Sequence, residues 1–301
     1  MTSATSPVLA SAQVLRPALA KQGYLAGDEL LLTLILAHRV GKPVLLEGEA
    51  GVGKTAIAAA LADAMNTELI RLQCYEGLDA AASLYEWDYA KQILHIRIAE
   101  SDEAMRKNLE KSIFDEAYLL ERPLLRTVRH RGPLAPVLLI DEIDRADEEF
   151  EAFLLEVLSE YQVSIPELGV LVAHHVPMTI LTSNGTRELS DALRRRCLYL
   201  WIDLPSPAEE RAIILSRVEG IQDALAEQIV NVMEKVRALD LGKPPGVSET
   251  LDWAAALVSM EREVLAAELV NQTAGCFLKS RDDIESLKLA SGEWFAGESG
   301  T

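Results

Sequence analysis

One eight-residue run constrains this chain more than any other part of its sequence: Gly48-Glu49-Ala50-Gly51-Val52-Gly53-Lys54-Thr55. It fits the pattern G-x-x-x-x-G-K-[ST], in which glycines let successive backbone N–H groups converge on phosphate oxygens. An apolar run at 44–46 predicts a buried strand before it, and an Ala-rich stretch at 56–65 predicts a helix after it. We therefore expect a phosphate-binding loop, with Lys54 at the β- and γ-phosphates and Thr55 at Mg²⁺. The plain alternative is a Gly-rich turn.

The composition narrows the fold and the class of partner. Hydrophobic residues make up 49% of the 301 positions and aromatic residues only 5%, which favours helices and parallel strands built from Leu, Ile, Val and Ala. The formal net charge of −18 argues against a nucleic-acid partner, because contacts to phosphates need a basic face. It suits a protein that binds other proteins, or a nucleotide held through Mg²⁺.

The cysteines and apolar stretches predict a cytoplasmic protein. Cys74, Cys197 and Cys276 stand far apart and form no C-x-x-C, so neither zinc nor a disulfide framework is indicated. Buried free thiols are typical of a reducing cytosol. The longest strongly apolar stretch, at 30–37, is far shorter than the roughly 20 residues of a membrane span, and the N-terminus does not read as a signal peptide.

Strand and helix patterns alternate through the first part of the chain, which predicts a mainly parallel sheet covered by helices on both faces. Nucleotide is then expected at the carboxyl ends of the strands. After Leu204 only helical patterns remain, opened by the capping box Ser206-Pro207-Ala208-Glu209. The expected strands are 44–47, 68–74, 137–140, 178–182 and 198–203, and the expected late helices are 208–218, 221–239, 249–260 and 263–278.

This pattern divides the chain into four expected parts. They are an N-terminal arm at 1–20, an α/β nucleotide-binding core at 21–205, an all-helical lid domain at 206–291 and a flexible tail at 292–301. Two hairpins are predicted to interrupt the core, one within 84–100 and one formed by 162–165 and 170–173. Such insertions often contact partner proteins, although a hairpin without a partner is the plain alternative.

The apolar strand pattern at 137–140 ends in Asp141 and Glu142. With a phosphate loop upstream, we expect Asp141 to hold Mg²⁺ through water and Glu142 to orient and deprotonate the attacking water. The alternative is an acidic helix N-terminus, because further acidic residues follow up to Glu149.

Other polar groups follow or precede later strands. Asn184, after the strand pattern at 178–182, is expected to hold the attacking water or touch the γ-phosphate; taken alone, an Asn-Gly turn explains it as well. Arg194, Arg195 and Arg196 precede the last strand, where a guanidinium suits phosphoryl charge on a neighbouring subunit. A helix C-terminal cap is the alternative for these arginines.

Two further polar groups have plainer explanations. A basic cluster faces either the next subunit or solvent, and a solvated helix face is the favoured interpretation; it contains Arg122, Arg126, Arg129, His130 and Arg131. His174 and His175 lie on an expected strand. No further ligand stands at a recognisable spacing from them, so metal binding is not predicted.

In this order, the phosphate loop, the strand-terminal Asp-Glu, the strand-terminal Asn, the arginines and the helical second part resemble the AAA+ ATPases, over about residues 21 to 290. The hairpins and the phrase Leu139-Ile140-Asp141-Glu142-Ile143-Asp144-Arg145-Ala146 are similar to the MoxR branch. The resemblance implies an AAA+ P-loop core followed by an all-α lid. It implies nucleotide contacts from Leu25, Ala26 and Gly48 to Ala56, Walker B acids at Asp141 and Glu142, sensor 1 at Asn184, and an arginine finger at Arg196 or Arg195.

One segment departs from the MoxR pattern. Many MoxR relatives carry an arginine at the start of a lid helix, whereas the corresponding segment here is Gly246-Val247-Ser248-Glu249-Thr250. An ordinary sensor 2 is therefore not expected.

Several strings, at 45–55, 72–79, 83–87 and 194–203, are similar to CoxD-type proteins, which assist maturation of the molybdenum–copper carbon monoxide dehydrogenase. The resemblance implies a hexameric ring that hydrolyses ATP with Mg²⁺ and remodels a client, here a molybdenum hydroxylase. It also implies an adaptor with a von Willebrand A domain. The alternatives are a NorQ- or CbbQ-type activator of nitric oxide reductase or rubisco, a P-loop small-molecule kinase, and a DNA-linked AAA+ motor.

Overall fold

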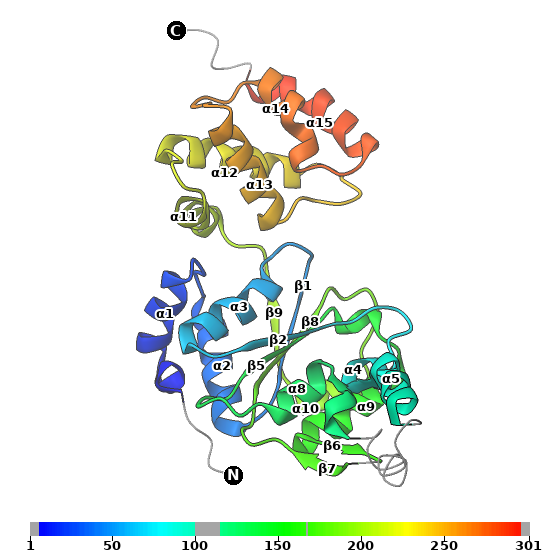
Figure 1. Ribbon diagram of the computed structural model, residues 1–301. Coiled ribbons are helices and arrows are strands. Elements are labelled where there is room, and N and C mark those ends of the chain that lie inside the picture. Colours follow the sequence, from blue (N-terminus) through cyan, green and yellow to red (C-terminus); the bar gives the residue numbers. More distant parts are fainter. Residues whose placement is uncertain (1–5, 100–114, 167, 296–301) are drawn as a thin grey trace.

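The computed structural model describes residues 6–99, 115–166 and 168–295, in two parts that Figure 1 shows one above the other. The first part is built on a five-stranded sheet in the order β2-β5-β8-β1-β9, with every pairing parallel. The strands are β1 (Val44–Gly48), β2 (Leu69–Gln73), β5 (Val137–Asp141), β8 (Met178–Ser183) and β9 (Leu198–Ile202). The predicted α/β fold with a parallel sheet is confirmed.

Helices cover both faces of this sheet. Side chains alternate along a strand, so on β1 Leu46 packs on one face and Leu45 on the other. The face of Leu46 is covered by η1 (Pro7–Ala10), α1 (Ala12–Lys21), α2 (Asp28–Val40) and α3 (Lys54–Met65). The face of Leu45 is covered by α4 (Ala80–Leu84), α8 (Pro123–Arg129), η3 (Ile143–Arg145), α9 (Glu148–Glu160) and α10 (Asp191–Arg196).

The N-terminal segment differs from the expected loose arm. From residue 6 onward it forms η1 and α1, and Leu9, Leu15 and Leu19 are fully buried against the sheet-covering helices. Arg16 adds a hydrogen bond of 2.8 Å from its Nη1 to the carbonyl of Ala26. The abundant Ala and Ser residues obscure this short apolar stripe in the sequence.

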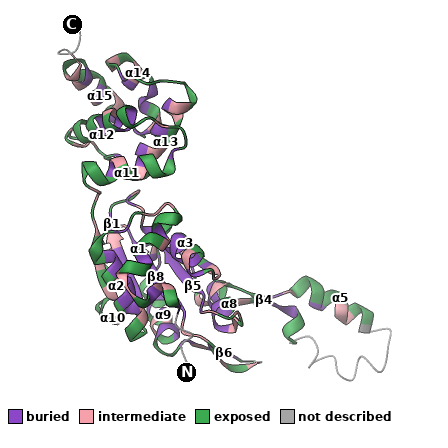
Figure 2. Cartoon of the chain, turned by 90° about the vertical axis from the view of Figure 1, so that its left-hand side faces the viewer, coloured by how far each residue is buried: buried purple, intermediate pink, exposed green. Residues whose placement is uncertain are grey.

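The first predicted hairpin, at 84–100, is wrong. β3 (Tyr85–Trp87) leads into a helix, α5 (Tyr89–Ala99), and pairs antiparallel with the later strand β4 (Leu119–Glu121), which follows η2 (Glu116–Tyr118). Asp88 favours the helix because its Oδ1 accepts the Lys91 N–H at 2.9 Å, as an N-cap does. Figure 2 shows β4 and α5 reaching away from the body of the core. Residue 100, the end of the expected hairpin, lies outside the described residues.

The second predicted hairpin is confirmed. β6 (Gln162–Ile165) pairs antiparallel with β7 (Gly169–Val172), and Gly169 takes the left-handed backbone that the turn requires, with φ +79°. The strand expected at His174 and His175 is wrong, because β7 ends at Val172 and both histidines lie in the loop that follows it. His175 Nε2 lies 3.0 Å from the Gly132 carbonyl. Within the described residues, no group of three His, Cys, Asp or Glu side chains is placed to hold a metal ion.

The basic cluster around α8 is largely neutralised within the chain, so it is not simply a solvated helix face. His130 Nδ1 lies 3.0 Å from Glu68, and Arg129 pairs with Glu121 at 2.9 Å. The other pairs are Arg122 with Glu86, Arg126 with Glu68, and Arg129 with Glu116.

The chain after β9 is entirely helical in the described residues and has an apolar core of its own. Its elements are α11 (Pro207–Arg217), α12 (Asp223–Arg237), α13 (Val247–Ser259), α14 (Ala267–Thr273), η4 (Ala274–Cys276) and α15 (Arg281–Trp294). The capping box at Ser206 is present. The single helix expected at 263–278 is instead α14 followed by η4, and α15 was not anticipated. Of the expected tail, residues up to Trp294 belong to α15 and residues 296–301 lie outside the described part.

No helix in the described part of the chain has both the length and the apolar character that crossing a bilayer demands.

A buried ion pair holds three helices of the second part together. Arg237 of α12 forms two hydrogen bonds, of 2.6 and 2.7 Å, with the carboxylate of Glu210 on α11. Thr250 of α13 donates to the same carboxylate at 2.7 Å, and the Arg237 Nε donates to the Pro245 carbonyl at 2.9 Å. Glu210 is 1% exposed, so these partners offset the cost of burying a carboxylate.

Glu210→Ala is expected to destabilise the protein by about 3–5 kcal/mol, because it leaves the guanidinium of Arg237 buried without its counter-charge. Arg281→Ala is the matched control. It breaks the exposed Arg281–Glu285 pair, which is expected to contribute about 1 kcal/mol or less. Urea unfolding followed by circular dichroism measures both, and equal losses would contradict the buried pair's importance.

The thiols give a second check on packing. Burial raises the pKa of Cys74 and that of Cys197 to about 12, and only a thiolate reacts with alkylating agents. Both thiols therefore stay protonated near pH 8 and are expected to resist iodoacetamide in the native protein, whereas half-buried Cys276 is expected to be alkylated first. Peptide mapping by mass spectrometry measures the order, and rapid labelling of Cys74 would contradict the packing.

Candidate functional site

The loop from Gly48 to Thr55 joins the carboxyl end of β1 to the start of α3. Gly51 and Gly53 adopt φ of +80° and +95°, a conformation that side-chain-bearing residues rarely take. Gly48 is required for a different reason, because a Cβ there would lie 2.3 Å from the Ile202 carbonyl oxygen. The loop thus has the backbone shape that lets successive N–H groups face a phosphate.

Lys54 is almost completely buried at the start of α3. Its Nζ donates to the carbonyls of Gly48 at 2.8 Å and of Glu49 at 2.6 Å, so the ammonium lies over the loop itself. Burial lowers the pKa of Lys54, while the nearby carboxylates of Asp144, Asp141 and Glu142 act in the opposite direction. The lysine therefore stands at the centre of an acidic environment.

Asp141 lies at the carboxyl end of β5 and is 2% exposed. Its Oδ1 accepts hydrogen bonds from the hydroxyls of Thr55, at 2.9 Å, and Thr182, at 2.6 Å. Its Oδ2 accepts from Arg71 of β2, at 2.6 Å from Nη2 and 3.1 Å from Nε. The structure therefore brings the first acid of the predicted pair to the hydroxyl that ends the phosphate loop.

Glu142 has a left-handed backbone, with φ +55°, which is uncommon for a residue other than glycine. Its Oε2 accepts from Gln73 at 3.0 Å and from Arg145 at 3.2 Å, and its N–H donates to the Thr182 hydroxyl at 2.9 Å. The carboxylate is thus held between β2 and η3, next to Asp141. Strain at a single residue in this position is typical of functional sites.

Asn184 follows β8 directly and is half-buried. Its N–H donates to Asp144 Oδ2 at 3.2 Å, and Thr186 donates to the same oxygen from its N–H, at 3.0 Å, and its hydroxyl, at 2.6 Å. Asp144 therefore fixes the loop that presents Asn184. In the sequence Asp144 is one of several acidic residues after Asp141, and its spacing of three from Asp141 is the signal that distinguishes it.

Three more site neighbours were missed. Arg71, Gln73 and Thr182 contact the two acids, although none belongs to a recognisable motif. Parallel pairing brings them there, because Gln73 is opposite Asp141 in the register of β2 with β5 and Thr182 lies at the end of β8, next along the sheet.

The oxygen groups at this site fit Mg²⁺. Thr55 Oγ1 and Asp141 Oδ1 are 2.9 Å apart, and a hydroxyl with a carboxylate is a hard-oxygen pair of the kind that holds this ion together with waters and phosphate oxygens. Asp144 Oδ1 is buried and has no hydrogen-bond partner among the described residues, and its carboxylate adds negative charge next to Lys54. A divalent cation would relieve that charge.

The arginines of α10 do not contact this cluster within the chain. Arg196 Nη2 donates to the carbonyls of Leu158, at 3.0 Å, and Ser159, at 2.7 Å, near the end of α9. Arg194 lies over the Tyr199 ring and 3.8 Å from Glu188. Arg195 is exposed and forms no ion pair or hydrogen bond with the described residues.

The segment before α2 borders the loop from the other side. The Tyr24 ring lies near Gly53, where an added Cβ would be 3.8 Å from it, and burial raises the pKa of Tyr24 to about 12. Next to it Leu25 is exposed and Ala26 is buried. Leu25 and Ala26 are the two positions of this segment at which the resemblance implies nucleotide contacts.

The helical part also touches the loop. The Ser248 N–H, in the first turn of α13, donates to the Gly51 carbonyl at 3.2 Å. Glu249 Oε2 accepts the Gly246 N–H at 3.0 Å. No arginine stands in this turn, as the sequence indicates.

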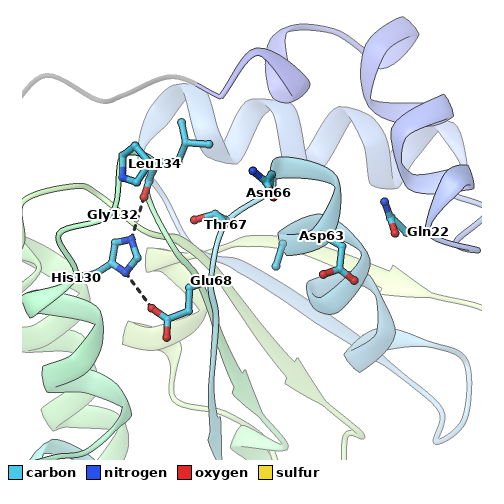
Figure 3. Close-up of a pocket in the computed structure, with 10 residues that line it drawn as sticks. Gln22, Asp63, Asn66, Thr67, Glu68, His130, Gly132 and Leu134 are labelled. Carbon is cyan, nitrogen blue, oxygen red and sulfur yellow. Dashed lines mark hydrogen bonds and ion pairs between the residues drawn. The ribbon is translucent and has the colours of Figure 1, made fainter.

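A pocket of about 510 Å³ lies at the opposite edge of the sheet, at the amino ends of β2 and β5 (Figure 3). His130 forms part of its wall, with Nδ1 3.0 Å from Glu68 and Nε2 3.1 Å from the Leu134 carbonyl. Because the phosphate loop is at the carboxyl ends of the strands, this pocket is separate from the site described above.

Residues 43–197 match the sequence family described as AAA domain (dynein-related subfamily), which is more than half of the chain. Among curated proteins, the gas vesicle ATPase GvpN of Haloferax mediterranei is 27% identical over 66% of this chain and 57% of its own length. The denitrification regulatory protein NirQ of Stutzerimonas stutzeri is 24% identical over 72% of this chain and 70% of its own length.

The chaperone MoxR1 of Mycobacterium tuberculosis is 32% identical, over 44% of this chain and 36% of its own length. The chain therefore spans only about a third of MoxR1 and a little over half of GvpN. The shared region contains the phosphate loop, both acids at the end of β5 and the strand that precedes Asn184. The chain belongs to the AAA domain family, dynein-related subfamily, and is a MoxR-like AAA+ ATPase.

Proposed function

We propose that this AAA+ ATPase is an ATP-driven chaperone that remodels a client protein from a hexameric ring. The observation that carries the proposal is the 2.9 Å hydrogen bond from the Thr55 hydroxyl, at the end of the phosphate loop, to Asp141, with Glu142 next in the chain and Lys54 beside these acids. The relatives GvpN, named as an ATPase, and MoxR1, named as a chaperone, support the same class of activity.

In the proposed reaction the loop N–H groups and Lys54 bind the phosphates, and Glu142 accepts a proton from the attacking water. Mg²⁺ held at Thr55 and Asp141 would neutralise charge on the phosphates. Asn184 positions the water, and its loop is fixed by Asp144. Gln73 and Arg145 hold the Glu142 carboxylate, so it must leave these partners or share them to take up the proton.

A guanidinium from a neighbouring subunit completes the proposed site. We assign this group to Arg195, because Arg196 is already bound to the α9 carbonyls and Arg195 is exposed at the same helix end. The sequence favoured Arg196, with Arg195 as its rival. An arginine supplied from a partner typically accelerates phosphoryl transfer by about 10³- to 10⁵-fold.

For the client, we propose the molybdenum–copper carbon monoxide dehydrogenase, in maturation of its metal cofactor. The local strings that resemble CoxD-type proteins support this, and an adaptor with a von Willebrand A domain belongs to the same proposal. The NirQ match favours a second candidate, activation of a denitrification enzyme such as nitric oxide reductase. The arm formed by β3, β4 and α5 is the proposed client-facing element, since it reaches away from the core.

Client identity is tested with a substrate trap. Glu142→Gln, expressed in the native host and held with ATP, is expected to retain the client, which mass spectrometry identifies after purification. Recovery of a molybdenum hydroxylase subunit supports the first candidate, and recovery of a denitrification enzyme supports the second. Rings that form with ATP but retain neither would contradict both assignments.

Glu142→Gln is also expected to lower ATP turnover by at least about 100-fold while nucleotide affinity changes by less than about threefold, because the amide cannot accept the proton. Phosphate release and the binding of a fluorescent ATP analogue measure the two effects. Glu148→Gln, an exposed acid at the start of α9, is the control and is expected to behave as wild type. Normal hydrolysis by Glu142→Gln would remove Glu142 from the reaction.

Complementation tests Arg195. Rings of Arg195→Ala alone, or of Glu142→Gln alone, are expected to be inactive, and mixed rings are expected to recover activity. In the mixture, an intact Glu142 faces an intact Arg195 from the adjacent subunit. Arg196→Ala is expected to lower stability by about 1–3 kcal/mol instead, because two α9 carbonyls lose their donor. Absence of recovery in the mixture would contradict catalysis across the subunit interface by Arg195.

A further inference from the structure

The helical part contacts the phosphate loop at Ser248 and Gly51, two residues that are 197 positions apart in the sequence. The Ser248 N–H donates to the Gly51 carbonyl at 3.2 Å, and the Ser248 hydroxyl lies 3.4 Å from the same oxygen. A Cβ added to Gly246 would lie 2.7 Å from the Ala50 carbonyl oxygen and 3.0 Å from the Gly51 Cα. No rotamer change relieves such a clash, because the atoms it meets belong to the backbone.

The peptide between Gly51 and Val52 faces both parts of the molecule. In a trans peptide the carbonyl and the N–H point in opposite directions. The Gly51 carbonyl points to Ser248, so the Val52 N–H points away from α13, as a loop that turns its N–H groups toward phosphate requires. A rotation of this peptide therefore reorients two groups together: the Val52 N–H, which would donate to phosphate, and the Gly51 carbonyl, which accepts from Ser248 of α13.

The first turn of α13 has no cationic side chain that could bind a phosphate group. It contains Glu249, whose carboxylate accepts the Gly246 N–H at 3.0 Å, and α13 contains neither Lys nor Arg. A carboxylate near the loop repels phosphate charge. No side-chain cation of this helix therefore attracts the γ-phosphate, and the backbone contact between Ser248 and Gly51 is the physical link that the structure shows.

We propose that Gly246 and Ser248 are positioning residues that couple nucleotide occupancy of the loop to the position of the helical domain, through the Gly51 carbonyl. This inference rests on the ATP binding proposed above. Phosphate fixes the Gly51–Val52 peptide, and the fixed carbonyl holds α13 against the loop. Because coupling between two equilibria is reciprocal, a variant that moves α13 off the loop weakens nucleotide binding by the same factor.

Gly246→Ala in the full-length protein tests this coupling. Gly246 has φ −85° and ψ −172°, which alanine adopts freely, so the substitution disturbs the contact and not the local backbone. Donor and acceptor dyes on exposed positions, introduced as Asp63→Cys in the core and Lys288→Cys in α15 with Cys276→Ser, report the position of the helical domain.

We expect the wild type to change its energy transfer when a non-hydrolysable ATP analogue binds. Gly246→Ala is expected to lose that change and to bind the analogue about 3- to 10-fold more weakly, with its unfolding temperature retained. Loss of the nucleotide response without loss of stability separates coupling from a merely structural contribution.

Gly275→Ala is the matched control, since a Cβ at this glycine of the helical part meets nothing within 4 Å, and it is expected to match the wild type. A wild-type response in Gly246→Ala, alongside lost binding in Lys54→Ala, would overturn the coupling and leave the ATP site standing. A wild type that binds no nucleotide would overturn the ATP site and the coupling with it.

If Gly246→Ala does not fold, hydrogen exchange of the wild type decides. Nucleotide is expected to slow exchange in the peptide that carries the Ser248 N–H, because its acceptor becomes fixed. Unchanged exchange there, with slowed exchange at the phosphate loop, would overturn the coupling.

Discussion

The buried carboxylate of Asp141 joins the elements on which the rest of this structure depends. It accepts hydrogen bonds from Thr55 at the start of α3, Thr182 on β8 and Arg71 on β2. A buried charge is costly unless it is paired and hydrogen-bonded, so these three elements are held around β5 by the group that the proposed chemistry needs for Mg²⁺. Stability and function therefore depend on the same side chain.

The acids around Asp141 also determine the electrostatics of the site. Asp141, Glu142 and Asp144 converge around Lys54, and one oxygen of Asp144 has no hydrogen-bond partner in the described part of the chain. Like charges at short range oppose one another in a site largely shielded from water. The arrangement suits the entry of a cation with a triphosphate, since the metal charge and the loop N–H groups compensate the acids and the phosphates together.

Sequence patterns predicted the core well where a residue's neighbours in the chain decide its conformation. The phosphate loop has glycine at 51 and 53, where the backbone φ is positive. The apolar runs predicted strands with helices on both faces of the sheet, and the strand side chains on both faces are buried. Patterns failed where long-range packing decides. A hairpin was expected within 84–100, but the partner of β3 in the antiparallel pair is β4, at 119–121, and the residues after Asp88 form the helix α5.

The candidate site divides in the same way. The sequence by itself determined the fold class and the identities of Lys54, Thr55, Asp141, Glu142 and Asn184, since motif spacing places them at strand ends that meet in any parallel sheet. Only the tertiary structure decided that Arg71, Gln73 and Asp144 support them, that Arg196 is bound to α9 while Arg195 is exposed, and that Gly246 rests on Gly51. The physical reason is that strand register and the packing of one domain on another depend on contacts between distant residues, and spacing along the chain does not encode those contacts.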